Sequence, residues 1–98
     1  MKNLTLRNLT EVCNGTWHGD DALLDREISA ITTDSRKIEK DCLFVPIVGE
    51  RVDAHRFIPD VMAKGALATL SERELSDADY PYIQIASSLQ AVKDIAEF

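Results

Sequence analysis

The sequence predicts an α/β fold, with three layers arranged around a small mixed sheet of four or five strands. Short runs rich in β-branched and other apolar residues alternate with segments whose apolar residues recur every three or four positions, which is the pattern of strands alternating with helices. The run 42–48 is apolar at every position, as expected for a central strand that is covered on both faces. With 98 residues the chain is long enough for one core, so we expect a single domain over 1–98.

The first third of the chain is predicted to begin with a short amphipathic helix. Thr5 is a plausible N-cap, and Asn14 with Gly15 would end the helix. The elements expected here, in chain order, are a helix at 6–13, a brief strand at 16–18, a segment at 23–27 that is either a loop or an edge strand, and a strand at 28–33.

The remainder is predicted to alternate strands and helices. Pro59 falls in the first turn of the expected middle helix, where it is tolerated, and Gly65 follows as its C′ residue. Pro46 cannot donate to a sheet ladder, so the strand that contains it either has an edge there or is interrupted. The expected elements are a strand at 42–48, a helix from His55 or Phe57 to Lys64, strands at 66–70 and 82–86 separated by an acidic loop at 71–81, and a last helix capped by Ser87 or Ser88.

Two polar turns follow neighbouring strands, at 33–36 and at 49–53. The side chains of Asp34 and Ser35 can hydrogen-bond the turning backbone, and Gly49 can adopt a positive φ and let a ligand approach the main chain closely. Two loops rich in donors beside buried strands are typical of a small-molecule site.

The charge distribution indicates where an anion would be repelled least. The net charge is −6, which argues against a general nucleic-acid binder, and 45% hydrophobic with 29% charged residues is an ordinary globular balance. Residues 36–64 carry six basic and five acidic groups, whereas both flanking segments are acidic. The basic and titratable candidates there, which are either ligand contacts or solvated surface charges, are Arg36, Lys37, Arg51, His55 and Arg56.

Several kinds of chemistry have no signature in this sequence. No glycine precedes a lysine in the spacing of a nucleotide-phosphate loop, and no nucleophile lies near either histidine, so we expect no catalytic residue in this chain. Cys13 and Cys42 lack zinc-site or disulfide spacing and are better explained as small core residues, so we expect no metal site. The sequence contains neither a membrane-length apolar run nor a signal-peptide core, which predicts a cytoplasmic protein.

The region of the two turns resembles the amino-terminal signature of the Mur ligases, which are ATP-dependent amide-forming ligases of peptidoglycan assembly. The matching letters are TTDSR at 32–36, LFV at 43–45 and GERVDAHRFI at 49–58. The resemblance continues through the expected helix ending in KGA at 64–66 and implies the same α/β architecture.

The chain departs from the family pattern at a few places. Lys40, Asp41 and Cys42 stand where Pro, Gly and Asp are usual; Asp41 tolerates the left-handed region and could form the turn. Ala54 replaces a common Gly, at a cost of about 1 kcal/mol if that position needs a positive φ. Pro46 replaces a common Ala.

The resemblance implies that this domain holds the UDP end of a UDP-N-acetylmuramoyl-peptide. ATP, magnesium and the reaction itself would belong to central and carboxy-terminal domains beyond this chain. The positions that the resemblance assigns to UDP binding are Thr33, Ser35, Arg36, Glu50, Arg51 and Val52, with Arg36 or Arg51 at the diphosphate, and those expected to support the loops are Asp34, Gly49, Asp53 and His55.

Three alternatives are open at this stage. The short leader ending in the Asn14–Gly15 turn and the triplet at 49–51 are most similar to family members that add D-alanyl-D-alanine to the tripeptide substrate, but members that add the third peptide residue have a similar domain. Arg36 contacts the diphosphate or is salt-bridged to Asp34 or Asp53, and His55 is a capping or packing group or a ligand contact. Finally, the chain could be a non-catalytic protein-interaction module with ordinary turns.

Overall fold

A five-stranded mixed sheet forms the centre of the molecule. The computed structural model describes residues 4–75 and 80–97. The strands are β1 (Thr16–His18), β2 (Ile31–Thr32), β3 (Leu43–Phe44), β4 (Ala68–Ser71) and β5 (Tyr82–Gln84), in the spatial order β1-β5-β4-β3-β2. Strands β2 to β5 pair in parallel, and β1 is antiparallel to β5, so the predicted mixed sheet is confirmed.

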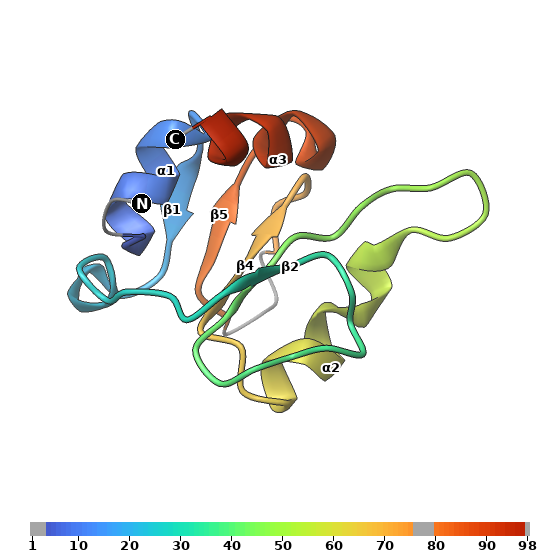
Figure 1. Ribbon diagram of the computed structural model, residues 1–98, viewed down its shortest axis with the longest axis horizontal. Coiled ribbons are helices and arrows are strands. Elements are labelled where there is room, and N and C mark those ends of the chain that lie inside the picture. The colour runs from blue at the N-terminus through green and yellow to red at the C-terminus, as the bar shows by residue number, and fades with distance from the viewer. Residues whose placement is uncertain (1–3, 76–79, 98) are drawn as a thin grey trace.

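Helices cover both faces of the sheet, which confirms the three layers (Figure 1). The helices are α1 (Leu6–Val12), α2 (Ile58–Ala63) and α3 (Ser88–Glu97), with two 3₁₀ turns, η1 (Asp21–Leu23) and η2 (Ala54–Phe57). Helices α1 and α3 lie on the face reached by Leu43, whereas α2 lies on the face reached by Phe44. Adjacent residues of β3 therefore belong to opposite halves of the core, as side-chain alternation along a strand requires.

Four strands are shorter than the sequence predicted, β4 and β5 by one and two residues and β2 and β3 by more. The expected strand 28–33 pairs as β2 only at Ile31 and Thr32, because the Ile28 amide donates to Leu4 at 2.9 Å instead of to a sheet neighbour. The expected strand 42–48 is confined to β3, and its last ladder contact is the Val45 amide with the Thr32 carbonyl at 2.9 Å. Pro46 follows and has no amide to donate, so pairing stops there.

The local helix signals are confirmed by capping geometry. The Thr5 hydroxyl accepts from the Asn8 amide at 3.1 Å, and the Ser87 hydroxyl accepts from the Gln90 amide at 3.2 Å. Gly65 has φ 113° just after α2, as a C′ residue should. Asp41, with φ 64°, forms its turn in the left-handed conformation that the usual Gly would adopt.

Four further expectations concern the segment 23–27, the acidic loop, the two cysteines and membrane spans. The ambiguous segment 23–27 begins at Leu23, the last residue of the 3₁₀ turn η1, and within it Glu27 makes an isolated bridge, to Thr5. The acidic loop is described at 72–75 and 80–81, and residues 76–79 lie outside the described residues. Cys13 and Cys42 are buried free thiols. Among the described residues, no helix is long and apolar enough to cross a membrane.

Candidate functional site

The two polar turns emerge from the same edge of the sheet. Strands β2 and β3 are parallel, with Thr32 opposite Phe44, so their carboxyl ends lie side by side. The 33–36 turn follows β2 directly. The 48–53 hairpin starts four residues after β3 and projects from the body of the molecule as the yellow-green loop in Figure 1. The carboxyl edge of a parallel sheet is where α/β folds commonly bind ligands.

The 33–36 turn is held by Asp34, which contacts both its own backbone and Arg36. The Asp34 Oδ1 atom accepts from the Arg36 amide at 2.9 Å and from Arg36 Nε at 3.1 Å, and Oδ2 accepts from Arg36 Nη2 at 3.2 Å. These guanidinium hydrogen bonds lower the pKa of Asp34. Of the two proposed partners of Arg36, Asp34 is therefore the one it has, although the Arg36 side chain is still 86% exposed.

A contact from α2 also holds this turn. The ammonium group of Lys64 donates to the Ser35 carbonyl at 3.3 Å and pairs with Asp60 at 3.0 Å. Ser35 thus contributes its backbone carbonyl to the structure of the turn. Thr33, directly after β2, is exposed.

The 48–53 hairpin is narrow and exposed at its tip. The Gly49 amide donates to the Val52 carbonyl at 2.9 Å, and Val48 pairs with Asp53 in an isolated bridge. Glu50, Arg51 and Val52 are all exposed, and Val52 keeps 46% of its surface open to solvent.

The expected positive φ at Gly49 is wrong, because only Gly19 and Gly65 among the glycines have one. The lack of room for a side chain explains this glycine better than its backbone conformation does. A Cβ atom at position 49 would lie 3.2 Å from the Val52 carbonyl oxygen, so a side chain would press on the hydrogen bond that closes the hairpin. Ala54 also has no positive φ, so the cost considered for it does not arise.

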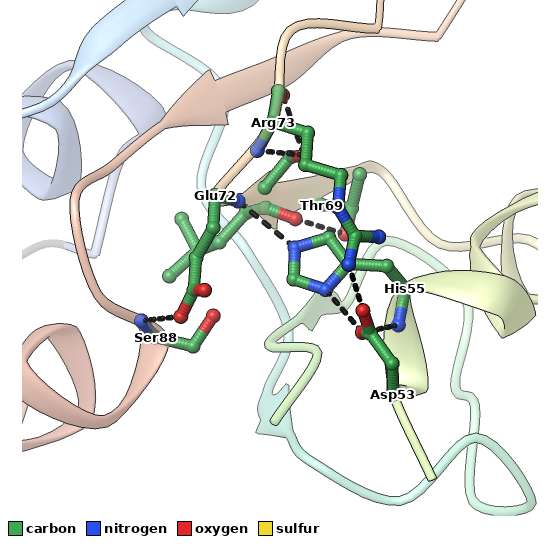
Figure 2. A network of polar contacts seen from close by, with 8 residues as sticks. Asp53, His55, Thr69, Glu72, Arg73 and Ser88 are labelled. Atoms are coloured by element: carbon green, nitrogen blue, oxygen red, sulfur yellow. Dashed lines mark hydrogen bonds and ion pairs between the residues drawn. The ribbon is translucent and has the colours of Figure 1, made fainter. Parts of the chain in front are cut away.

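The base of the hairpin is anchored by Asp53 and His55 (Figure 2). Asp53 caps η2: its Oδ1 atom accepts from the His55 amide at 2.9 Å and lies 2.7 Å from His55 Nδ1. The His55 ring is buried, and its Nε2 atom lies 2.9 Å from the Glu72 amide. The capping role predicted for Asp53 is therefore confirmed, and His55 is a packed, hydrogen-bonded group.

Sequence reasoning missed the rest of this network. Arg73 pairs with Asp53 Oδ2, and the Glu72 carboxylate accepts from the Ser88 amide at 2.7 Å at the start of α3 (Figure 2). The Asp-x-His spacing signals the local part, but Glu72 and Ser88 lie 17 and 33 positions beyond His55, and no sequence pattern links them. The hairpin is thereby tied to the end of β4 and, through Glu72, to α3.

The two turns differ from the buried network beneath them in the groups that they present at the sheet edge. They present exposed hydroxyl-bearing and guanidinium-bearing residues. The described residues contain no cluster of His, Cys, Asp or Glu that could hold a metal ion. A pocket of about 230 Å³ lies elsewhere, between the end of α1 and the start of α3. It is lined by Cys13, Asn14, Ala86, Ser87, Gln90, Ala91 and Asp94.

Comparison with known proteins gives a consistent family. A family profile described as "Mur ligase family, catalytic domain" matches residues 27–98. The chain is 42% identical over 96 residues to UDP-N-acetylmuramoyl-tripeptide--D-alanyl-D-alanine ligase of Escherichia coli (strain K12), covering 98% of this chain and 20% of that protein. It is 43% identical over 75 residues to UDP-N-acetylmuramoyl-L-alanyl-D-glutamate--2,6-diaminopimelate ligase of Cytophaga hutchinsonii, covering 74% of this chain and 15% of that protein.

Solved structures give the same result for the fold. A crystal structure of MurF from Acinetobacter baumannii superposes with a TM-score of 0.84 and 33% identity, covering 97% of this chain and 20% of that one. MurF ligase from Thermotoga maritima in complex with ADP superposes with a TM-score of 0.60 and 27% identity, covering 68% of this chain and 16% of that one. The chain spans about a fifth of the length of the relatives that it matches over nearly its whole length.

Proposed function

The chain belongs to the Mur ligase family, and from that premise we propose that it is the domain of a UDP-N-acetylmuramoyl-tripeptide:D-alanyl-D-alanine ligase that binds the UDP end of the substrate. The observation that carries the proposal is the placement of both signature turns at one edge of the sheet, after parallel neighbours β2 and β3. That arrangement lets two loops approach one ligand from adjacent strands.

Each turn has groups suited to a uridine nucleotide. A flat, neutral base needs a slot with a few fixed donors and acceptors, and the exposed hairpin residues Glu50, Arg51 and Val52 offer backbone groups beside an apolar side chain. Thr33 and Ser35 face the ligand from the other turn in this proposal.

The guanidinium groups take a different part in the proposal. Arg51 is exposed at the hairpin tip and would offset the diphosphate charge. Arg36 holds its turn through Asp34, and its high exposure leaves its remaining donors free for an anion.

The reaction of the whole protein would need parts that lie beyond this chain. We propose that ATP and magnesium act in a central domain and that a third domain binds D-alanyl-D-alanine, the full-length protein acting in the cytoplasm where ATP is available. There the substrate carboxylate would be activated as an acyl phosphate and attacked by the dipeptide amine. The present domain would orient the nucleotide so that the peptide reaches that centre.

A second candidate is the ligase that adds the third peptide residue. The 43% identity to the Cytophaga hutchinsonii diaminopimelate ligase supports it, but that match covers 74% of the chain, against 98% for the Escherichia coli D-alanyl-D-alanine ligase. The two candidates are distinguished by an ATP-dependent assay of the full-length protein. The first predicts consumption of UDP-N-acetylmuramoyl-tripeptide with D-alanyl-D-alanine. The second predicts consumption of UDP-N-acetylmuramoyl-L-alanyl-D-glutamate with diaminopimelate.

Binding by the domain itself is tested by nuclear magnetic resonance. Adding UDP to the ¹⁵N-labelled chain should shift the amides of Thr33, Ser35 and 50–52, with weak affinity because the sugar and peptide contacts are missing. The purine analogue ADP should shift them much less. The variant Arg51→Ala should weaken UDP binding. The control is Arg7 on α1, whose guanidinium group pairs with Asp25 at 3.0 Å, and Arg7→Ala should leave UDP binding unchanged.

No shift in either turn at millimolar UDP, together with self-association in sizing experiments, would contradict nucleotide binding. That result would favour the protein-interaction module. Self-association alone would not, because Val48 and Leu89, 49% and 60% exposed, could mediate it in either case.

A further inference from the structure

The His55 ring joins the hairpin to the end of β4 through both of its nitrogen atoms (Figure 2). One side faces Asp53, the last residue of the hairpin, at 2.7 Å. The other faces the backbone amide of Glu72, just after β4, at 2.9 Å. The side chain is only 3% exposed, so water cannot replace either partner without the ring moving.

This geometry fixes the protonation state of the ring. A backbone amide is only a donor, so Nε2 must accept from Glu72 and carry no proton. The single ring proton is then on Nδ1, where it is donated to Asp53. A second proton would have to enter at Nε2, where it would meet the Glu72 amide hydrogen and break the contact.

The surroundings of the ring favour this neutral form. Burial lowers the pKa of His55 below its ordinary value, and the Glu72 carboxylate offsets this only in part. Asp53 on the hairpin side would favour a charged ring, but its other oxygen is already paired with Arg73. From η2 itself, Arg56 is exposed and lies over the Phe57 ring.

We propose that His55 is a positioning residue, which holds the 48–53 hairpin in its nucleotide-binding position only while its ring is neutral. The tip of the hairpin is exposed, and its own backbone contacts are the Gly49 to Val52 hydrogen bond, the Val48 to Asp53 bridge and the Ala54 amide to the Ile47 carbonyl at 3.1 Å. Besides His55, the side-chain contact that ties the hairpin to the end of β4 is the ion pair of Asp53 with Arg73. Protonation would release the Glu72 end of the link and leave the ion pair between Asp53 and Arg73 as the remaining side-chain contact of the hairpin with the end of β4. The inference rests on the proposed function, since it assigns the hairpin to the base of the nucleotide.

The binding test uses UDP-N-acetylglucosamine, whose phosphates are both esterified and keep a constant charge near neutral pH. The affinity of the chain, read from the amide shifts of 50–52, should fall roughly threefold or more as the pH is lowered from about 7.5 through the titration of the His55 ring. The variant His55→Gln should show a change below about twofold. His18→Gln, which alters the other histidine at β1, should keep the full pH dependence of the unaltered chain.

A second measurement needs neither ligand nor variant. The ¹⁵N shifts of the His55 ring should show a proton on Nδ1 at neutral pH, and the protection factor of the Gly49 amide should fall as that ring titrates. A charged ring or an Nε2 proton at neutral pH, or Gly49 protection that ignores the titration, would overturn the inference.

The two proposals can fail separately. If UDP-N-acetylglucosamine binds at the turns with an affinity that does not change with pH, or that changes equally in His55→Gln, the positioning role is wrong and the proposed function stands. If no ligand shift appears at any pH, the proposed function fails. The Gly49 measurement then still decides whether His55 holds the hairpin.

Discussion

Lys64, directly after α2, donates from its ammonium group to the backbone carbonyl of Ser35, which lies 29 positions earlier in the chain. This contact ties the first polar turn to a helix on the adjacent layer. The hairpin is tied by different means, through the buried His55 and the end of β4. The two turns that carry the family signature are thus fixed independently, each by a side chain from a helical segment.

The Lys64 contact should matter more for the turn than for the fold. Because Lys64 and Asp60 are both substantially exposed, Lys64→Met should change the free energy of unfolding by less than about 1 kcal/mol. Loss of the Ser35 anchor should nevertheless weaken UDP binding by roughly two- to fivefold, the equivalent of one modest hydrogen bond. The control Lys93→Met removes the same charge from α3 and should leave binding unchanged. An equal loss in both variants would assign the effect to net charge.

Asp41 provides a test of backbone strain. Its φ of 64° lies in the left-handed region, and the turn is clamped on both sides, by the Asp41 amide to the Gly65 carbonyl at 2.9 Å and by the Ser29 amide to the Asp41 carbonyl at 3.0 Å. Asp41→Gly should therefore be more stable than Asp41→Ala by on the order of 1 kcal/mol in urea unfolding. Both variants lose the Arg26 salt bridge, so that loss cancels in the comparison. Equal stability would mean that the turn relaxes to a negative φ.

The elements that the sequence predicts well are those set by neighbouring residues. Thr5 and Ser87 cap their helices through amides three positions away, and Gly65 ends α2 by its own conformation. The strands β2 and β3 are harder, because their length depends on partners that the sequence does not reveal. Pro46 marked the interruption, but the departure of Ile28 toward Leu4 had no local signal.

The candidate site also contains contacts between neighbouring residues, which the sequence predicts, and contacts between distant residues, which it does not. The Asp34 turn and the Asp53 cap follow from side chains that reach their own backbone two residues on. The Glu72 contacts with His55 and with Ser88 join three separate elements, and only the folded chain brings them together. The positive φ expected at Gly49 is wrong. A position can require glycine either because its φ is positive or because a side chain has no room, and at Gly49 the second reason applies.

The Asp34–Arg36 pair should appear in acid titration. The Arg36 hydrogen bonds hold the pKa of Asp34 below its ordinary value of 3.8, so the stability that the pair contributes is present above that value and is lost as pH falls through the folded-state pKa. Arg36→Gln should raise the pKa of Asp34 toward 3.8, as read from its carboxyl ¹³C shift. Arg7→Gln removes a comparable exposed ion pair, between Arg7 and Asp25, and should leave the pKa of Asp34 unchanged. A shift of similar size in both variants would point to net charge and against the direct contact.

The two cysteines should differ in reactivity although both are buried. Burial, with a smaller contribution from Asp94, raises the pKa of Cys13 to about 11, so roughly 0.1% of its thiol is ionised at about pH 8. Cys13 lines the pocket between α1 and α3, whereas Cys42 is fully buried in the core beside β3. Alkylation by iodoacetamide should therefore occur slowly at Cys13 and rise about tenfold per pH unit below about pH 11, since the thiolate is the reacting form. Cys42 should react only at the rate of global unfolding.

The variants Cys13→Ala and Cys42→Ala leave one thiol each and separate the two rates. Reaction of Cys13 at the rate of a free thiol near neutral pH would contradict the buried position, and equal rates in the two variants would mean that both thiols wait for unfolding.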